Sequence, residues 1–158
     1  MGDKPIYVAT EHSGPVLKCK FNPEDCMFAT CSSDRTAKYF RCEDKCFGFA
    51  SSTDLVSTPI TSIAYNEDGK VLYTASNDSL KSWNMYKGGL LLESIETSWK
   101  GVQDMAVIQD ALMGIAFSSG HLSLWIWDAK QKIKNSSRVS ESQASLVLPK
   151  IGNKFSKK

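Results

Sequence analysis

The feature that most constrains this chain is a stretch that occurs twice, 44 residues apart. Thr30-Cys31-Ser32-Ser33-Asp34 is echoed by Thr74-Ala75-Ser76-Asn77-Asp78, and the same shift aligns Pro15-Val16 with Pro59-Ile60. About ten positions agree in this one register, which indicates an internal structural repeat. The echoed residues are therefore candidates for scaffold before they are candidates for chemistry.

Within each copy the apolar residues predict short β-strands. They alternate or cluster in runs rich in Val, Ile, Tyr, Phe and Thr, bounded by turns such as Asn66-Glu67-Asp68-Gly69. A weaker third copy supplies three such runs, at 104–107, 112–117 and 122–128, and ends on Trp-Asp. A period of about 40–45 residues with four strands and a Trp-Asp ending is typical of a WD-repeat β-propeller. The sequence predicts an all-β fold, a partial propeller of about three four-stranded antiparallel blades.

The repeat also sets the expected domain boundaries. We expect a strand of a preceding blade in residues 1–10, blades at 11–54 and 55–98, a degenerate last blade at 99–128, and a flexible basic tail at 129–158. The prediction of a tail depends on the distribution of charge. Residues 1–128 contain 11 Lys and Arg and 16 Asp and Glu, whereas the last 30 residues contain 8 Lys and Arg and 1 acidic residue. Since closed propellers have about four to eight blades, we expect the isolated chain to self-associate, whether it is part of a longer propeller or a shortened product.

The first copy resembles the WD-repeat pattern of His, Val, Phe-x-Pro, Ser-x-Ser-x-Asp and Trp. It reads His12-Ser13-Gly14-Pro15-Val16, then Phe21-Asn22-Pro23, then 30–34 and Phe40. The resemblance implies a hydrogen-bonded chain of His, Ser or Thr, Asp and Trp that pins three strands, since buried polar groups need partners. The expected blade anchors are His12, Thr30, Ser32, Asp34, Thr74, Ser76, Asp78, Trp83, Trp127 and Asp128.

Each copy departs from this pattern at one position. Phe40 replaces the Trp of the first copy, Val56 or Thr58 stands where the second His belongs, and His121 occupies the position of the third Asp. We therefore expect degenerate blades with incomplete networks.

The third copy carries a narrower resemblance. Ser98-Trp99-Lys100-Gly101-Val102-Gln103-Asp104-Met105-Ala106, followed by Leu112-Met113-Gly114-Ile115-Ala116-Phe117 and Trp127-Asp128, is similar to the last propeller blade of the katanin regulatory subunit family. That family has a Trp-Gly-Lys-Val-x-Asp run, here with Gly and Lys inverted, and then a Leu-Ile-Gly run. The stretch from Asp78 to Trp83, one residue shorter than in a standard repeat, is similar to the family's penultimate blade.

The resemblance implies a non-catalytic interaction scaffold in the cytoplasm and cytoskeleton. Such a scaffold targets a microtubule-severing ATPase to microtubules and to the centrosome or spindle poles, so the implied partners are the katanin catalytic ATPase subunit and microtubules. The family binds the ATPase through a C-terminal helical region that this sequence does not contain, and that contact is not carried over. The alternatives are a WD-repeat adaptor of another cytosolic or nuclear complex and a truncated paralogue.

The expected partner contacts are mostly basic residues. They are Arg35, Lys81, Trp99, Lys100, Lys130, Lys132, Lys134 and Arg138. For the charged residues the alternative is solvated surface, and for Trp99 it is core packing between blades. Nucleic-acid binding by the tail would need aromatic side chains for stacking, and Phe155 is the tail's only one, which disfavours specific recognition of nucleic acid.

Other functions find little support in the sequence. It has no Gly-x-Ser-x-Gly elbow and no phosphate-binding glycine loop, so we expect neither an enzyme nor a cofactor. Cys42 and Cys46 lack a nearby His pair, so we expect no metal, and five cysteines, an odd number, favour a reducing compartment. The longest apolar run, 111–117, is far shorter than the roughly 20 residues of a membrane-spanning helix.

Overall fold

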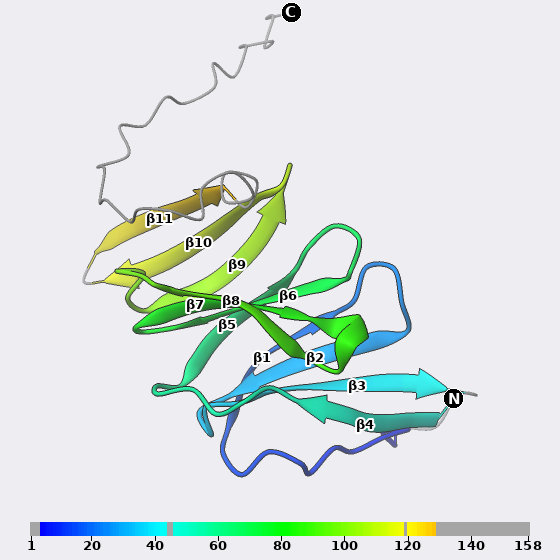
Figure 1. Ribbon diagram of the computed structural model, residues 1–158. Helices are drawn as coiled ribbons and strands as arrows, with labels where there is room; N and C mark the ends of the chain where they lie inside the picture. The colour runs from blue at the N-terminus through cyan, green and yellow to red at the C-terminus, as the bar shows by residue number, and fades with distance from the viewer. Residues whose placement is uncertain (1–3, 44–45, 119, 129–158) are drawn as a thin grey trace, which may run out of the picture.

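The chain folds into three antiparallel β-sheets that follow one another in sequence order. A computed structural model describes residues 4–43, 46–118 and 120–128. Figure 1 shows the three sheets stacked one on the next, the first at the bottom and the third at the top. The described residues contain no α-helix, only a single turn of 3-10 helix, η1 (Met85–Lys87). The prediction of an all-β, partial propeller is confirmed.

Each sheet is a simple meander in which consecutive strands pair. The first sheet contains β1 (Val16–Phe21), β2 (Met27–Ser32), β3 (Ala37–Glu43) and β4 (Cys46–Ser52). The second contains β5 (Ile60–Tyr65), β6 (Val71–Ser76), β7 (Ser79–Asn84) and β8 (Leu90–Glu96). The third contains β9 (Val102–Ile108), β10 (Ala111–Ser118) and β11 (His121–Asp128). Four strands were expected in each sheet, and the third has three within the described residues.

The core lies between the sheets. One cluster of buried side chains joins the first sheet to the second and includes Cys31, Tyr39, Ile63 and Trp83. A second cluster joins the second sheet to the third and includes Leu80, Trp99, Met105 and Leu112. Burying one such side chain stabilises the fold by roughly 1.5–3 kcal/mol, so each pair of adjacent sheets is held mainly by its shared apolar layer.

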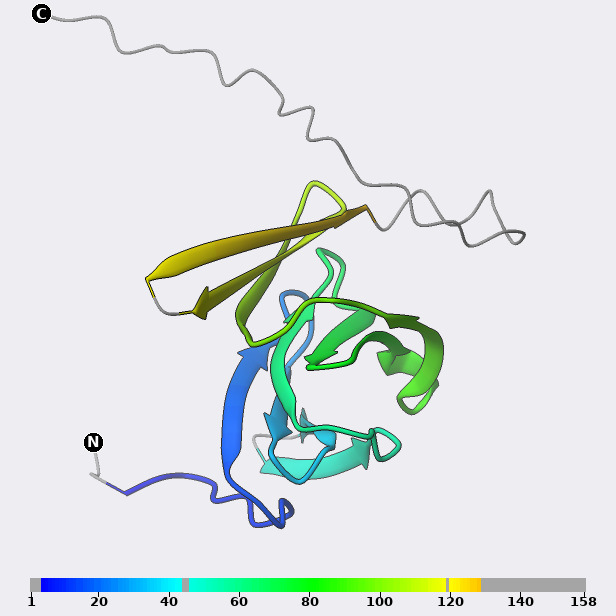
Figure 2. The ribbon, with the colours of Figure 1, turned by 90° about the vertical axis from the view of Figure 1, so that its left-hand side faces the viewer.

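Strand β5 occupies the middle of this arrangement. It contacts β1 and β2 on one side and β9 on the other, and Figure 2 shows β1 and β5 next to each other. Five of its six residues are buried, because neighbours cover both of its faces. A strand covered on both faces is rich in apolar residues. Four of the six residues of β5 are apolar, and the small Ser62 is buried among them.

Turns at one end of the sheets tie neighbouring sheets together. The Asn22 side-chain nitrogen Nδ2 donates a hydrogen bond of 2.8 Å to the carbonyl of Gly69, which links the β1–β2 turn to the β5–β6 turn. The backbone nitrogen of Gln109 donates to Glu67 Oε1 at 3.1 Å, which links the β9–β10 turn to the same β5–β6 turn. The sheets are thus fixed to each other by polar contacts as well as by the core.

Residues 4–10, for which we expected a strand, form none in this chain. The segment runs along the outside of the first sheet (Figures 1 and 2), where the ring of Tyr7 lies 6.3 Å from that of Phe40 and 6.1 Å from that of Phe47. Within the described part of the chain this segment pairs with no strand. No helix within the described part of the chain is long and apolar enough to cross a membrane.

Candidate partner-binding groove

The first blade anchor joins three side chains from distant parts of the chain. His12 Nδ1 donates to Asp34 Oδ2 at 2.7 Å, and His12 Nε2 lies 2.8 Å from the hydroxyl of Thr30 on β2. The Ser32 hydroxyl donates to the carbonyl of Gly14 at 3.1 Å and accepts from the backbone nitrogen of Asp34 at 3.0 Å. The expected anchors of this copy therefore lie together, and they fix the chain entering β1 to the β2–β3 turn.

Asp34 is held as a carboxylate. Burial raises its pKa, but hydrogen bonds from Thr36 and His12 outweigh burial and lower the pKa to about 2. A carboxylate whose oxygens already accept these bonds is a structural group. It lacks the properties of a proton donor near neutral pH.

The second anchor is built from hydroxyl groups instead of an imidazole. Asp78 accepts hydrogen bonds from Ser57 at 2.5 Å, from Ser76 at 2.7 Å and from Thr58 at 3.0 Å. Bonds from Ser57 and Ser76 are the main reason that its pKa lies well below the ordinary value. Thr58, one of the two residues proposed for the missing His position, and its neighbour Ser57 take over the contact with the turn carboxylate.

The second copy also keeps the tryptophan that the first has lost. Trp83 Nε1 donates to the Thr74 hydroxyl at 3.0 Å, and both residues are buried. In the first copy Phe40 pairs with β2 where Trp83 pairs with β6, and its ring stacks on that of Phe28 at 4.8 Å. Each copy thus retains one part of the network, His-Thr-Asp in the first and Thr-Trp in the second.

The third copy is anchored by packing. The ring of Trp127 meets that of Tyr73 edge-on at 6.2 Å, and Trp125 stacks on Trp99 at 6.2 Å. Trp127 thus anchors β11 through aromatic contact with the second sheet. Asp128, at the end of β11, is exposed.

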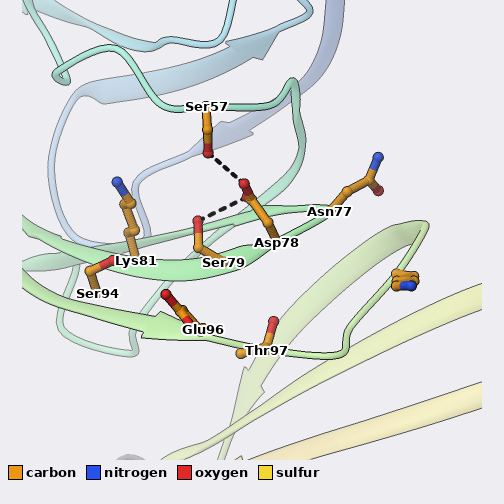
Figure 3. A pocket seen from close by; sticks show the side chains of 9 residues that line it. Ser57, Asn77, Asp78, Ser79, Lys81, Ser94, Glu96 and Thr97 are labelled. Atoms are coloured by element: carbon orange, nitrogen blue, oxygen red, sulfur yellow. Dashed lines mark hydrogen bonds between the residues drawn. The ribbon is translucent and has the colours of Figure 1, made fainter.

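An open polar groove lies beside the β6–β7 turn, with a volume of about 470 Å3 (Figure 3). Figure 3 shows Ser57 and Asp78 on one side and Glu96 and Thr97 on the other. Its lining residues come from the β4–β5 linker, the β6–β7 hairpin, β8 and the turn after β8: Ser57, Asn77, Asp78, Ser79, Lys81, Ser94, Glu96, Thr97 and Lys100.

Two lysines line the groove. Lys81 projects from the middle of β7, half-buried, and Lys100 is exposed in the turn before β9. Within its described residues the structure records no salt bridge for either lysine, whereas the carboxylate of Asp78 is saturated with hydroxyl donors. The ammonium groups are therefore available to an anionic group of a partner.

The other expected contacts are placed differently. Arg35 is exposed on the β2–β3 turn, where its φ of 70° puts it in the left-handed region. Trp99 as an exposed contact is wrong: it is 8% exposed and packs in the second core cluster, because Gly114 leaves room for its ring. The four tail residues Lys130, Lys132, Lys134 and Arg138 lie outside the described residues.

Part of the groove was not predicted from the sequence. Ser57, Asn77, Glu96 and Thr97 lie in turns or at a strand end, outside the apolar pattern from which the strands were recognised. One feature of the sequence could have indicated Ser57. The second copy lacks the His that would bind Asp78, so the carboxylate needed other hydrogen-bond donors, and Ser57 is the neighbour of Thr58 at that position.

The described residues contain no group of three or more His, Cys, Asp or Glu side chains arranged to hold a metal ion. Among the described residues no two cysteines form a disulfide, and burial raises the pKa of Cys31 to about 12. The lining of the groove offers hydroxyls, two ammonium groups and the carboxylate of Glu96 for recognition.

Comparison with known proteins agrees with this geometry. A family model described as "WD domain, G-beta repeat" matches residues 3–41 and 50–84, which include most of the first two sheets. Residues 3–41 and 50–84 are WD repeats. The search of curated proteins found no match.

Solved WD-repeat structures share the fold. The WD40 propeller domain of Doa1 is similar with a TM-score of 0.59 and 13% identity, over 73% of this chain and 39% of that one. U3-55K and the RRP9 WD40 repeats each give a TM-score of 0.63 and 14% identity, over 75% of this chain and 37% of theirs. The chain thus spans less than two fifths of the length of these structures, and the likeness concerns the fold.

Proposed function

We propose that this WD-repeat chain is a non-catalytic interaction scaffold of the katanin regulatory type, which targets a microtubule-severing ATPase to microtubules and to the centrosome or spindle poles. The observation that carries the proposal is the polar groove with two lysines, Lys81 on strand β7 and Lys100 in the turn before β9. Loops held by a rigid frame are common binding elements in repeat proteins.

The position of Lys100 connects the groove to the sequence resemblance. Lys100 lies in the turn within the stretch 98–106, whose motif is similar to the last blade of the katanin regulatory family. Trp99 and Gly114 of the same motif pack against each other, since a Cβ at Gly114 would lie 3.0 Å from the Trp99 ring. The motif therefore combines a packing unit with an exposed cation beside it.

Electrostatics supports an acidic partner such as the microtubule surface. Besides the two groove lysines, the sequence of residues 129–158 contains eight Lys and Arg and one acidic residue. Positive groups of this kind accelerate and strengthen contact with an acidic surface, and salt screens them over about 10 Å at 0.1 M ionic strength.

Co-sedimentation with microtubules at low and high salt tests the proposal. We expect salt-sensitive pelleting that weakens when Lys81 and Lys100 are both changed to Glu, and that weakens further when residues 129–158 are removed. The matched control is Lys87→Glu, because Lys87 is an exposed lysine of η1 outside the groove. Far-UV circular dichroism shows that each sample is folded.

Two outcomes would redirect the assignment. Folded chain that fails to pellet at low salt contradicts microtubule targeting and favours a WD-repeat adaptor of another complex. Equal loss from Lys87→Glu and from the groove variant contradicts a role for the groove. Binding of the severing ATPase is tested separately, by titrating the labelled ATPase subunit against the same variants.

A further inference from the structure

Two cysteines of the first sheet lie opposite each other on neighbouring stretches of backbone. In the ladder between β2 and β3, Met27 is the partner of Arg41, so the next step of the ladder brings Cys26 opposite Cys42. The backbone nitrogen of Cys42 donates a hydrogen bond of 2.8 Å to the carbonyl of Cys26, which extends the ladder by this step. The fold thus brings together two thiols that are far apart in the sequence.

The spacing of such a pair suits a disulfide. In an antiparallel sheet about 5.5 Å separates the Cα atoms of two opposite residues whose backbones are hydrogen-bonded to each other. Disulfides usually join Cα atoms that are about 4.4–6.8 Å apart. Residues directly opposite each other on antiparallel strands also direct their side chains to the same face. The thiols of Cys26 and Cys42 therefore share one face at a spacing that a disulfide can span.

Cys26 lies at the end of the β1–β2 turn, just before β2 begins. Its backbone nitrogen donates to Asp25 Oδ1 at 2.8 Å, and the backbone nitrogen of Met27 donates to the carbonyl of Asp25 at 2.7 Å. The residue is thus part of a bend, and a turn adjusts its conformation more readily than the interior of a strand does. A small adjustment here would bring the two sulfur atoms into bonding geometry.

The other three cysteines are not placed in this way. Cys46 is close to Cys42 in the sequence, but the register of β3 with β4 puts it one residue away from the partner of Cys42, and therefore on the opposite face of the sheet. Cys19 pairs with Thr30 on β2, and Cys31 is fully buried in the core. Of the five cysteines, Cys26 and Cys42 are the two that the sheet sets opposite each other.

The two thiols also differ in access to solvent. Cys26 is exposed, whereas Cys42 is half-buried. Thiol pairs that respond to oxidants commonly combine an accessible cysteine, which reacts first, with a neighbouring cysteine that completes the disulfide. The exposure of the pair assigns the first role to Cys26 and the second to Cys42.

We propose that Cys26 and Cys42 form a reversible redox site, which a small-molecule disulfide such as glutathione disulfide converts into an intrachain disulfide. The Cys26 thiolate attacks one sulfur of the oxidant, the S–S bond breaks, and the first glutathione leaves. The Cys42 thiolate then attacks the sulfur of Cys26 and expels the second glutathione. The two protein thiols lose two electrons and two protons in total, and these reduce the oxidant to two glutathione thiols.

The position of the disulfide would make it reversible and give it a structural effect. One of its sulfur atoms belongs to an exposed residue, and exposed disulfides are more readily reduced than buried ones. Transient disulfides of this kind occur in reducing compartments. The bond would tie the β1–β2 turn to β3, and the same turn reaches the second sheet through the hydrogen bond from Asn22 to Gly69. Oxidation would therefore restrain a turn that links two sheets.

Oxidation of the folded 158-residue chain with glutathione disulfide, followed by alkylation of the remaining thiols and peptide mass spectrometry, tests the proposal. The Cys26–Cys42 disulfide should be at least tenfold more abundant than any other intrachain pair, and an excess of reduced glutathione should remove it. The same oxidation in urea is the comparison. Short loops close most easily in an unfolded chain, so Cys42–Cys46 and Cys26–Cys31 should compete there.

Three single substitutions separate the roles of the thiols. In Cys42→Ser the second step is blocked, so Cys26 should retain glutathione as a mixed disulfide. In Cys26→Ser neither product should form at this site. Cys46→Ser is the matched control, because it removes another exposed thiol of the same sheet, and the yield of the Cys26–Cys42 disulfide should stay within about twofold. Far-UV circular dichroism shows that each variant is folded.

Four results would overturn the proposal. They are a folded wild-type chain in which Cys26 carries glutathione while Cys42 remains a thiol, Cys42–Cys46 as the main product of the folded chain, the same distribution of pairs in the folded and the urea-unfolded chain, and a Cys26–Cys42 disulfide that excess reduced glutathione does not remove. The third result would mean that distance along the sequence selects the partner. None of these results depends on the proposed microtubule function, which is measured by pelleting.

Discussion

His12 and Asp34, 22 residues apart in the chain, are joined by a hydrogen bond of 2.7 Å between Nδ1 and Oδ2. Only 6% of either side chain is exposed. The bond closes the entry of the first blade onto its β2–β3 turn, and the carboxylate oxygens also accept from Thr36 and from the backbone of Ser13. A buried carboxylate with this many donors is stabilised in its charged form.

Asp34→Asn should lower the free energy of unfolding by about 1.5–3 kcal/mol, because hydrogen bonds to a charged acceptor are replaced by weaker ones. The measurement is urea unfolding at fixed protein concentration. Asp104→Asn is the control, since Asp104 is 52% exposed and lies 3.6–3.7 Å from Lys18 and Lys20, a surface contact worth about 0–1 kcal/mol. Equal losses from the two substitutions would contradict the role given to Asp34.

The same carboxylate predicts an acid-dependent loss of stability. The pKa of Asp34 is about 2 in the fold, below the ordinary value of 3.8, so its contribution is complete above about pH 4 and is lost as the pH falls through 2. The free energy of unfolding should fall over this window in the wild type and fall less in Asp34→Asn. Identical acid profiles for the two chains would show that another carboxylate governs the transition.

Trp83 and Thr74 should be coupled energetically. Trp83→Phe removes the indole donor and Thr74→Val removes the acceptor, and each leaves the other partner buried and unsatisfied. The double variant leaves neither group unsatisfied, so the losses should be less than additive, by about 1 kcal/mol in a double-mutant cycle of urea unfolding. Strict additivity would mean that the hydrogen bond contributes nothing to the fold.

The sheets could be predicted from the sequence because their signal is repeated. Runs of β-branched and aromatic residues recur with the same turns 44 residues on, so that β1, β2 and β4 reappear as β5, β6 and β8. The contact of His12 with Asp34 followed from the WD-repeat pattern. The strand repeat is a property of spacing along the chain, whereas the contact between His12 and Asp34 was implied by the resemblance.

The groove could not be predicted in the same way. Its residues are brought together by the packing of the β4–β5 linker and the turn after β8 against one hairpin, and no periodicity connects Ser57 with Thr97. The burial of Trp99 depends on Gly114 lying opposite its ring across the second core. Such partners are set by sheet stacking, and a sequence offers only the residue types.

Gly69 should be far less replaceable than Gly88. Both have a φ of +67°, but a Cβ at Gly69 would lie 2.2 Å from Asn22 Oδ1, whereas a Cβ at Gly88 would meet nothing within 4 Å. Gly88→Ala should therefore cost only the left-handed strain, about 1–2 kcal/mol. Gly69→Ala should cost more by at least about 1 kcal/mol, because it also breaks the Asn22 bond between two sheets. Similar thermal shifts for the two variants would contradict the inter-sheet role of Asn22.

Trp99 and Lys100 are neighbours in sequence with opposite roles. Trp99→Ala should lower the free energy of unfolding by about 3–5 kcal/mol, because a large ring is removed from the core between the second and third sheets. Lys100→Ala should change stability by less than about 0.5 kcal/mol, since its side chain is exposed.

Urea unfolding followed by tryptophan fluorescence measures both effects, and pelleting with microtubules at low salt measures the proposed function in the folded state. Lys100→Ala should weaken pelleting with stability unchanged. Trp99→Phe keeps an aromatic ring in the core and should leave pelleting intact. If Trp99→Phe abolished pelleting while the chain remained folded, the tryptophan itself would have to reach the partner, contrary to its burial against Gly114.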